Sequence, residues 1–116
     1  MLPTDLEYRT LQSCYDDIRR QLHYHSVGPK LLSKGVITFE AHEEIKSEKV
    51  SFMQNEAFLK FLMNGSRDGF YAFQNILVNT AGMTHLYDSL QGRIVVTYFN
   101  MKDPSAKVAS LPGYPD

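Results

Sequence analysis

The sequence predicts an all-α domain, and two observations support this fold class. Apolar residues recur at steps of three and four over roughly the first ninety residues, which is the spacing of one face of an α-helix. Signals that end and start helices lie between these periodic segments. In the clearest of them, Gly35 can end one helix in the left-handed conformation, and Thr38 can cap the next. We therefore expect several short helices joined by tight turns.

Length and composition fit a single soluble domain. The 116 residues are 43% hydrophobic and 22% charged, which is enough for one core without disulfide or metal support. The single cysteine, Cys14, excludes an internal disulfide and suits a reducing compartment. No apolar run approaches the roughly 20 residues that span a bilayer, and the first residues lack the pattern of a signal peptide. We expect a cytoplasmic location and no membrane partner.

The first two helices are predicted over residues 4–22 and 29–34. Thr4 caps the first helix. Its inward face is the apolar set at helical spacing, namely Tyr8, Leu11, Tyr15, Ile18 and Leu22. Gly28 and Pro29 predict a break and a restart, because the missing N–H of a proline costs nothing in the first turn of a helix.

The third and fourth helices are predicted over residues 39–47 and 50–63. Phe39 and Ile45 are expected to point inward from the third helix. The fourth has a broad apolar face made of Val50, Gln54, Ala57, Phe58, Phe61 and Leu62. Glu56 and Lys60 lie on its opposite side, in the favourable i, i+4 orientation.

Turn residues at 64–69 precede a fifth helix that starts at Phe70 and stops near Thr80 or Gly82. Thr84 caps a sixth helix that ends at Gly92. Residues 94–99 are rich in β-branched and aromatic side chains, which suits a strand. A lone strand cannot pair with a helical bundle, so extension of the last helix, loose packing and pairing with another chain all stay open.

This pattern divides the chain into a helical bundle over residues 1–92 and a C-terminal extension or linker over residues 93–116. The extension contains three prolines, which is typical of linkers.

The order and spacing of the helical segments resemble the caspase recruitment domain (CARD), a member of the death-domain superfamily. The similarity covers residues 5–91. Residues 11–22 are similar to the opening helix of the family, and residues 31–38 resemble its leucine-leucine, basic, glycine-valine-leucine-threonine corner. Residues 58–77 resemble its fourth and fifth helices, and residues 82–90 its closing helix. Within the family, the prodomains of initiator caspases and their adaptors look most similar. The turn at 64–69 departs from the family pattern by being longer and by placing an acidic residue beside the glycine.

The resemblance implies a six-helix antiparallel bundle with the Greek-key topology of death domains. It also implies a non-enzymatic homotypic interaction module that recruits or oligomerises caspases or adaptors in apoptosis or innate-immune signalling. The partner would be another CARD-containing protein or a second copy of this chain, and a decoy that caps assembly is the alternative within the family.

Members of this family frequently pair a basic surface with an acidic one. The resemblance assigns the basic face to Arg19, Arg20, Lys49 and Lys60. It assigns the acidic face to Glu40, Glu43 and Glu44. Both sets also fit solvated helix faces or charges placed favourably near helix ends, and these two interpretations stay open.

Other chemistry has weaker support. Cys14 beside a histidine suggests a thiol–imidazole pair, but a cysteine in an apolar stripe is expected to be inert, with its thiol pKa raised by burial. His23, His25 and His42 match no zinc-ligand spacing. We therefore expect no catalytic residue, cofactor or metal site. The alternative from a different functional class is a small helical nucleic-acid-binding domain. The net charge of −1 disfavours this alternative, so we expect no nucleic-acid partner.

Overall fold

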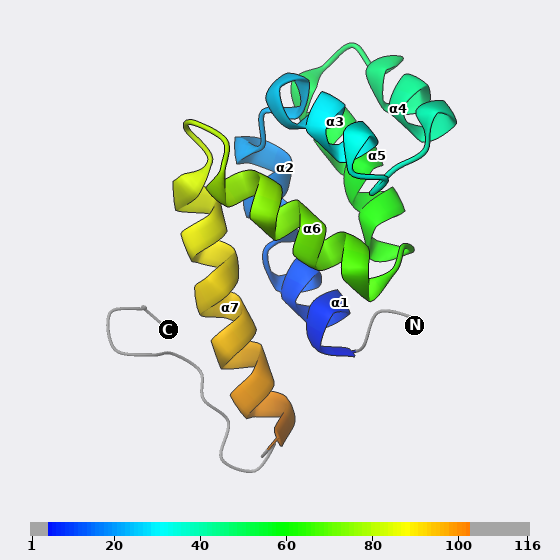
Figure 1. Cartoon of the computed structure of the whole chain (residues 1–116). Coiled ribbons are helices and arrows are strands. Elements are labelled where there is room, and N and C mark those ends of the chain that lie inside the picture. The colour runs from blue at the N-terminus through cyan, green and yellow to red at the C-terminus, as the bar shows by residue number, and fades with distance from the viewer. Residues whose placement is uncertain (1–4, 103–116) are drawn as a thin grey trace.

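A computed structural model of the chain describes residues 5–102, and these residues form seven helices and no strand (Figure 1). The helices are α1 (Asp5–Ser13), α2 (Tyr15–Gln21), α3 (Tyr24–Ser33), α4 (Phe39–Lys46), α5 (Ser51–Met63), α6 (Arg67–Val78) and α7 (Thr84–Lys102). The predicted all-α class is confirmed. Helix α5 packs against α2 and α4, α6 packs against α3 and α7, and α1 packs chiefly against α7.

The core lies where these helices meet and is built from large apolar side chains. Those that are almost completely enclosed include Ile18, Leu31, Ile45, Phe58, Phe70, Phe73, Leu77 and Leu90. The rings of Phe58 and Phe73 pack at a tilt, with 5.2 Å between their centroids, and they join α5 to α6. Burial of these side chains is the main favourable contribution to folding.

The first predicted helix is broken into α1 and α2 at Cys14. Two hydroxyls bond back to carbonyls in the preceding turn: Thr10 Oγ1 donates to Leu6 O at 2.7 Å, and Ser13 Oγ donates to Thr10 O at 2.9 Å. Bonds of this kind compete with the helix ladder and bend helices. The bend allows α1 to pack on α7 while α2 packs on α5. It also turns Tyr8 toward solvent, so the predicted inward position of that residue is wrong.

Helix α3 begins at Tyr24, so the predicted break at Gly28 and Pro29 is wrong. Pro29 lies inside the helix, although it cannot donate a backbone hydrogen bond there. Packing outweighs this loss, because Tyr24, Val27 and Leu31 follow helical spacing and are all buried. Gly28 permits the close approach of neighbouring side chains, since a Cβ at that position would lie 2.8 Å from the Tyr24 ring.

The corner between α3 and α4 agrees with the prediction. Gly35 has a φ of 73°, and the Thr38 hydroxyl accepts a hydrogen bond from Ala41 N at 3.1 Å. Ile45 is buried as expected, but Phe39 is 61% exposed, so its predicted inward position is wrong. The buried face of α4 is made by Ala41, His42 and Ile45 instead.

Helix α5 has nearly its predicted bounds but a rotated inward face. Val50 is the exposed N-cap rather than a core residue. The buried face consists of Asn55, Phe58, Leu59 and Leu62. Helix α6 begins earlier than predicted, at Arg67, because Ser66 caps it and accepts a hydrogen bond from Gly69 N at 3.1 Å. The turn before α6 is therefore shorter than residues 64–69.

Helix α7 continues through Gly92 to Lys102, so the predicted end of the last helix at Gly92 is wrong. Val96 and Thr97 are buried in this continuation of α7, whereas Val95, Tyr98 and Phe99 are exposed. Of the three possibilities left open for residues 94–99, extension of the last helix is the one observed. Residues 103–116, the rest of the predicted extension or linker, lie outside the described residues.

Candidate interaction surface

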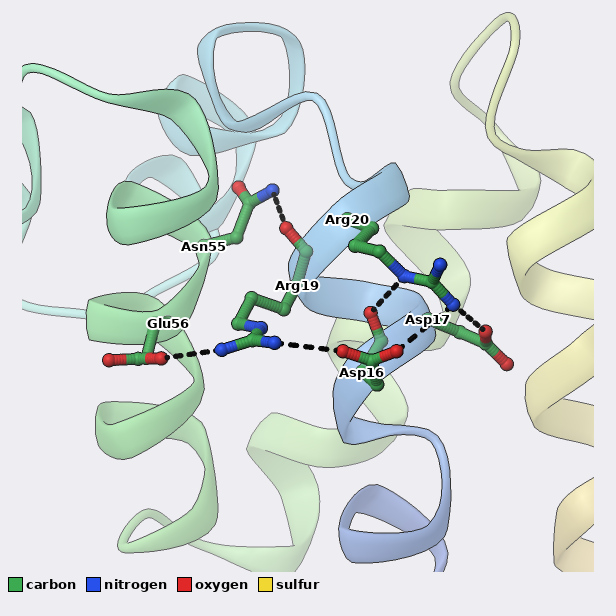
Figure 2. A network of polar contacts seen from close by, with 6 residues as sticks. All are labelled: Asp16, Asp17, Arg19, Arg20, Asn55 and Glu56. Carbon is green, nitrogen blue, oxygen red and sulfur yellow. Dashed lines mark hydrogen bonds and ion pairs between the residues drawn. The ribbon is translucent and has the colours of Figure 1, made fainter.

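A buried asparagine fixes α2 against α5. Asn55 is 1% exposed, and its Nδ2 donates to Arg19 O and to Leu22 O, both at 2.8 Å. The last carbonyls of a helix have no partner within the helix, so these two bonds satisfy groups at the end of α2. Asn55 thus sets the spacing and orientation of the two helices whose outer sides carry the charges described next (Figure 2).

Arg19 crosses from α2 to α5. Its Nη2 donates to Asp16 Oδ1 at 2.9 Å, and its Nη1 donates to Glu56 Oε2 at 3.3 Å. The hydrogen bonds to these two carboxylates raise the pKa of Arg19 above its usual value. The guanidinium also lies over the ring of Phe52, 5.5 Å from its centroid. Arg19 is therefore held by several contacts within the chain.

Arg20 is held by acids on its own helix. Its Nη2 lies 3.0 Å from Asp16 Oδ2 and 3.5 Å from Asp17 Oδ1 (Figure 2). We call Asp16, Asp17, Arg19, Arg20 and Glu56 the α2–α5 charged cluster. It contains two positive and three negative side chains, so the two arginines of the predicted basic face do not give this surface a net positive charge.

The two lysines of the predicted basic face are exposed. Lys49 precedes α5, and Lys60 lies in its last turn, so most of the length of this helix separates them. Neither lysine forms an ion pair with another residue of 5–102. The expected pairing of Glu56 with Lys60 is absent from this part of the chain, because Glu56 bonds Arg19. Lys49 and Lys60 are thus the members of the predicted set whose charges are available to a partner.

The three acids of the predicted acidic face lie together on α4 and are exposed. We call Glu40, Glu43 and Glu44 the α4 acidic edge. Only Glu43 has an ion pair within the described residues, at 3.7 Å from Lys46 Nζ. The exposed ring of Phe39 adjoins these acids at the start of the helix. This edge combines negative charge with an accessible aromatic side chain.

The α4 acidic edge and the α2–α5 charged cluster lie on different sides of the bundle. Figure 1 shows α4 and α2 apart, with α3 and α5 between them. Helix α5 contacts both α2 and α4. A contact between two different surfaces of neighbouring molecules is head-to-tail and can propagate, but the excess of negative charge in the α2–α5 charged cluster does not favour its contact with the α4 acidic edge.

The cysteine and histidines considered for catalysis or metal binding are either buried in the fold or stacked on one another. Cys14 is buried, and burial raises its thiol pKa from 9.0 to about 11, as predicted. His42 is buried beside Tyr24, whereas His23 and His25 are exposed and stack on each other. Within residues 5–102, no three His, Cys, Asp or Glu side chains lie close enough together to hold a metal ion.

Sequence reasoning missed Asn55 and the acids that surround Arg19. A signal for Asn55 was present, because it stands at helical spacing from three apolar residues that are buried with it: Phe58, Leu59 and Leu62. The pairing of Arg19 with Asp16 follows from i, i+3 spacing on one helix. Its pairing with Glu56 depends on how two helices pack, which spacing along the chain does not reveal.

Among the helices of residues 5–102, none has both the length and the apolar character needed to cross a bilayer. Comparison of the chain with models of protein families, with curated proteins and with solved structures gives no match.

Proposed function

We propose that this chain is a non-enzymatic interaction module of the CARD type, with death-domain topology, that assembles with another domain of the same fold. The observation that carries the proposal is the α4 acidic edge, three exposed carboxylates on one short helix, together with two exposed lysines, Lys49 before α5 and Lys60 in its last turn.

The helix order supports the proposed topology. Helices α1 and α2 form one broken helix in the position of the first expected helix, and α3 to α7 follow in the positions of the other five. The glycine and threonine corner that carried much of the resemblance lies between α3 and α4, with the expected conformation.

The distribution of charge supports recognition of a protein partner. Opposite charges on two surfaces speed encounter and fix the register of association. An exposed aromatic ring within a charged rim is a common source of binding energy at interfaces, and Phe39 has this position beside the α4 acidic edge. The arginines contribute less than the sequence suggests, because Asp16, Asp17 and Glu56 neutralise them.

The test is self-association of the purified chain, measured by light scattering over a range of concentration and salt. One double variant, Glu40→Lys with Glu44→Lys, reverses two charges of the acidic edge and leaves the Glu43–Lys46 pair intact. The other, Lys49→Glu with Lys60→Glu, reverses the two lysines. Neither double variant breaks an ion pair within the described residues, so both are expected to fold.

We expect the wild type to associate at low salt, each double variant to remain monomeric, and an equimolar mixture of the two to associate again. Lys34→Glu and Asp88→Lys are controls that each reverse one charge, of the same kind, at an exposed position outside both surfaces. They should associate like the wild type. A wild type that stays monomeric throughout, or controls that lose association equally, would refute self-assembly through these surfaces.

A further inference from the structure

A pocket of about 340 Å³ opens where the beginning of α3, the end of α4 and the first turn of α5 meet. Its lining consists of Tyr24, His25, Pro29, His42, Lys46 and Gln54. Three of these side chains carry nitrogen groups that can bear positive charge, and none is a carboxylate. Lys46 can only donate hydrogen bonds, and Tyr24, His25, His42 and Gln54 can each donate or accept them.

His42 is the buried member of this set, at 8% exposure, and its Nδ1 lies 2.8 Å from the Tyr24 hydroxyl. Tyr24 is also buried, and burial raises its pKa to about 12, so the phenol keeps its proton. Within residues 5–102, His42 Nδ1 is the acceptor that the Tyr24 hydroxyl reaches. A hydrogen bond donated by the hydroxyl to Nδ1 places the ring hydrogen on Nε2, which leaves Nε2–H as a donor.

The Nε2–H of His42 has no hydrogen-bond partner in the described part of the chain. Some polar side-chain atoms, such as Asn55 Oδ1 and Gln74 Nε2, are fully enclosed and lack a partner, but His42 Nε2 is not one of these enclosed atoms. The small accessible area of His42 therefore includes Nε2, and His42 lines the pocket. Because Nε2 is accessible from the pocket, a ligand there can accept its hydrogen bond.

Lys46, one turn after His42 on α4, brings a positive charge to the same pocket. Its Nζ lies 3.7 Å from Glu43 Oε2, at the long end for an ion pair, and both side chains are more than half exposed. Such a pair contributes little, so the ammonium is free to turn to another anion. The pocket also adjoins the first turn of α3, where the helix dipole favours negative charge and the N-cap residue provides no side-chain hydrogen bond.

We propose that this pocket binds an oxyanion of a small molecule, a phosphate or a carboxylate group, through Nε2–H of His42 and Nζ of Lys46. The ring of Tyr24 and Pro29 provide apolar surface for the rest of the ligand. No residue of the α4 acidic edge lines the pocket, but Glu43 of that edge pairs with Lys46, so the two sites are adjacent.

The experiment is a nuclear magnetic resonance titration of the isotope-labelled chain with inorganic phosphate and, separately, with acetate, at constant ionic strength. We expect saturable shifts of the His42 ring nitrogens and of the His25 and Lys46 signals. The stronger of the two probes identifies the preferred oxyanion. Absence of a saturable shift at His42 with both probes would overturn the proposal.

Two variants separate a site from general attraction of anions. Lys46→Gln removes the charge in the pocket and should weaken binding of the stronger probe about tenfold. Lys34→Gln makes the same change at the exposed end of α3, outside the pocket, and should leave binding unchanged. Equal weakening in both variants would refute the proposed site. Because Lys34 and Lys46 are exposed, both variants are expected to keep the wild-type fold.

Discussion

Asn55→Ala should destabilise the fold far more than the loss of one exposed polar side chain does. The Asn55 side chain is almost fully enclosed and joins α5 to two carbonyls at the end of α2. Alanine removes both donors and leaves the carbonyl of the buried Leu22 without its partner.

The magnitude follows from these contacts. Each lost hydrogen bond costs about 1 kcal/mol net, and the stranded carbonyl adds at least about 1 kcal/mol. The better helix propensity of alanine offsets only about 0.5 kcal/mol. We expect the free energy of unfolding to fall by about 2.5 kcal/mol, which corresponds to a decrease in Tm of at least roughly 10 °C for a domain of this size.

Urea titration followed by circular dichroism measures this change, with Asn79→Ala as the matched control. Asn79 Nδ2 also donates to a helix carbonyl at 2.8 Å, that of Asn75, but in an exposed setting. Its replacement should cost about 0.5 kcal/mol, because water can take the place of the lost donor. If the two variants lose the same stability, Asn55 does not hold α2 and α5 together as described.

Three further changes test other parts of the structure. Val96→Ala should lower the free energy of unfolding by about 2 kcal/mol and Val95→Ala by less than about 0.5 kcal/mol, because only Val96 is buried; equal losses in denaturant titrations would contradict the helical packing of α7. Burial raises the pKa of Cys14 from 9.0 to about 11, so the unfolded chain binds fewer protons between these values. Stability should therefore fall more steeply from about pH 9 to pH 11 in the wild type than in Cys14→Ala, and parallel pH curves would exclude this effect. Tyr24→Phe removes the donor of a buried hydrogen bond and should lower the free energy of unfolding, measured by thermal denaturation, by about 1 kcal/mol more than Tyr98→Phe on the exposed face of α7.

The local signals in the sequence predict much of the fold. The corner at Gly35 and Thr38 has the expected conformation, because a glycine with positive φ and a capping hydroxyl act within a few residues. The bounds of α5 follow from its long apolar period in the same way.

The errors occur where contacts between distant segments outweigh local preference. Residues 94–99 have strand-like composition, yet they are helical, with Val96 and Thr97 buried in the bundle. Pro29 is accommodated inside α3 because the buried face of that helix continues on both sides of it. Neither outcome is visible in the residues themselves.

In the candidate site too, some features follow from local sequence and others depend on contacts between distant segments. The position of the acidic residues on α4 follows from their spacing, and all three are exposed. The electrostatic state of Arg19 does not follow from spacing, because its partner Glu56 is 37 positions away. A charge predicted to be available to a partner is thus already engaged within the chain.

The bend at Cys14 directs the first helix onto the last one, and α1 and α7 lie side by side in opposite directions (Figure 1). Contacts between such distant segments form late, since a long loop must close first. During synthesis, α1 leaves the ribosome long before its partner exists. The side of α1 that packs on α7 therefore stays uncovered until α7 has also emerged, and the contact between these two helices forms only late in the synthesis of this segment.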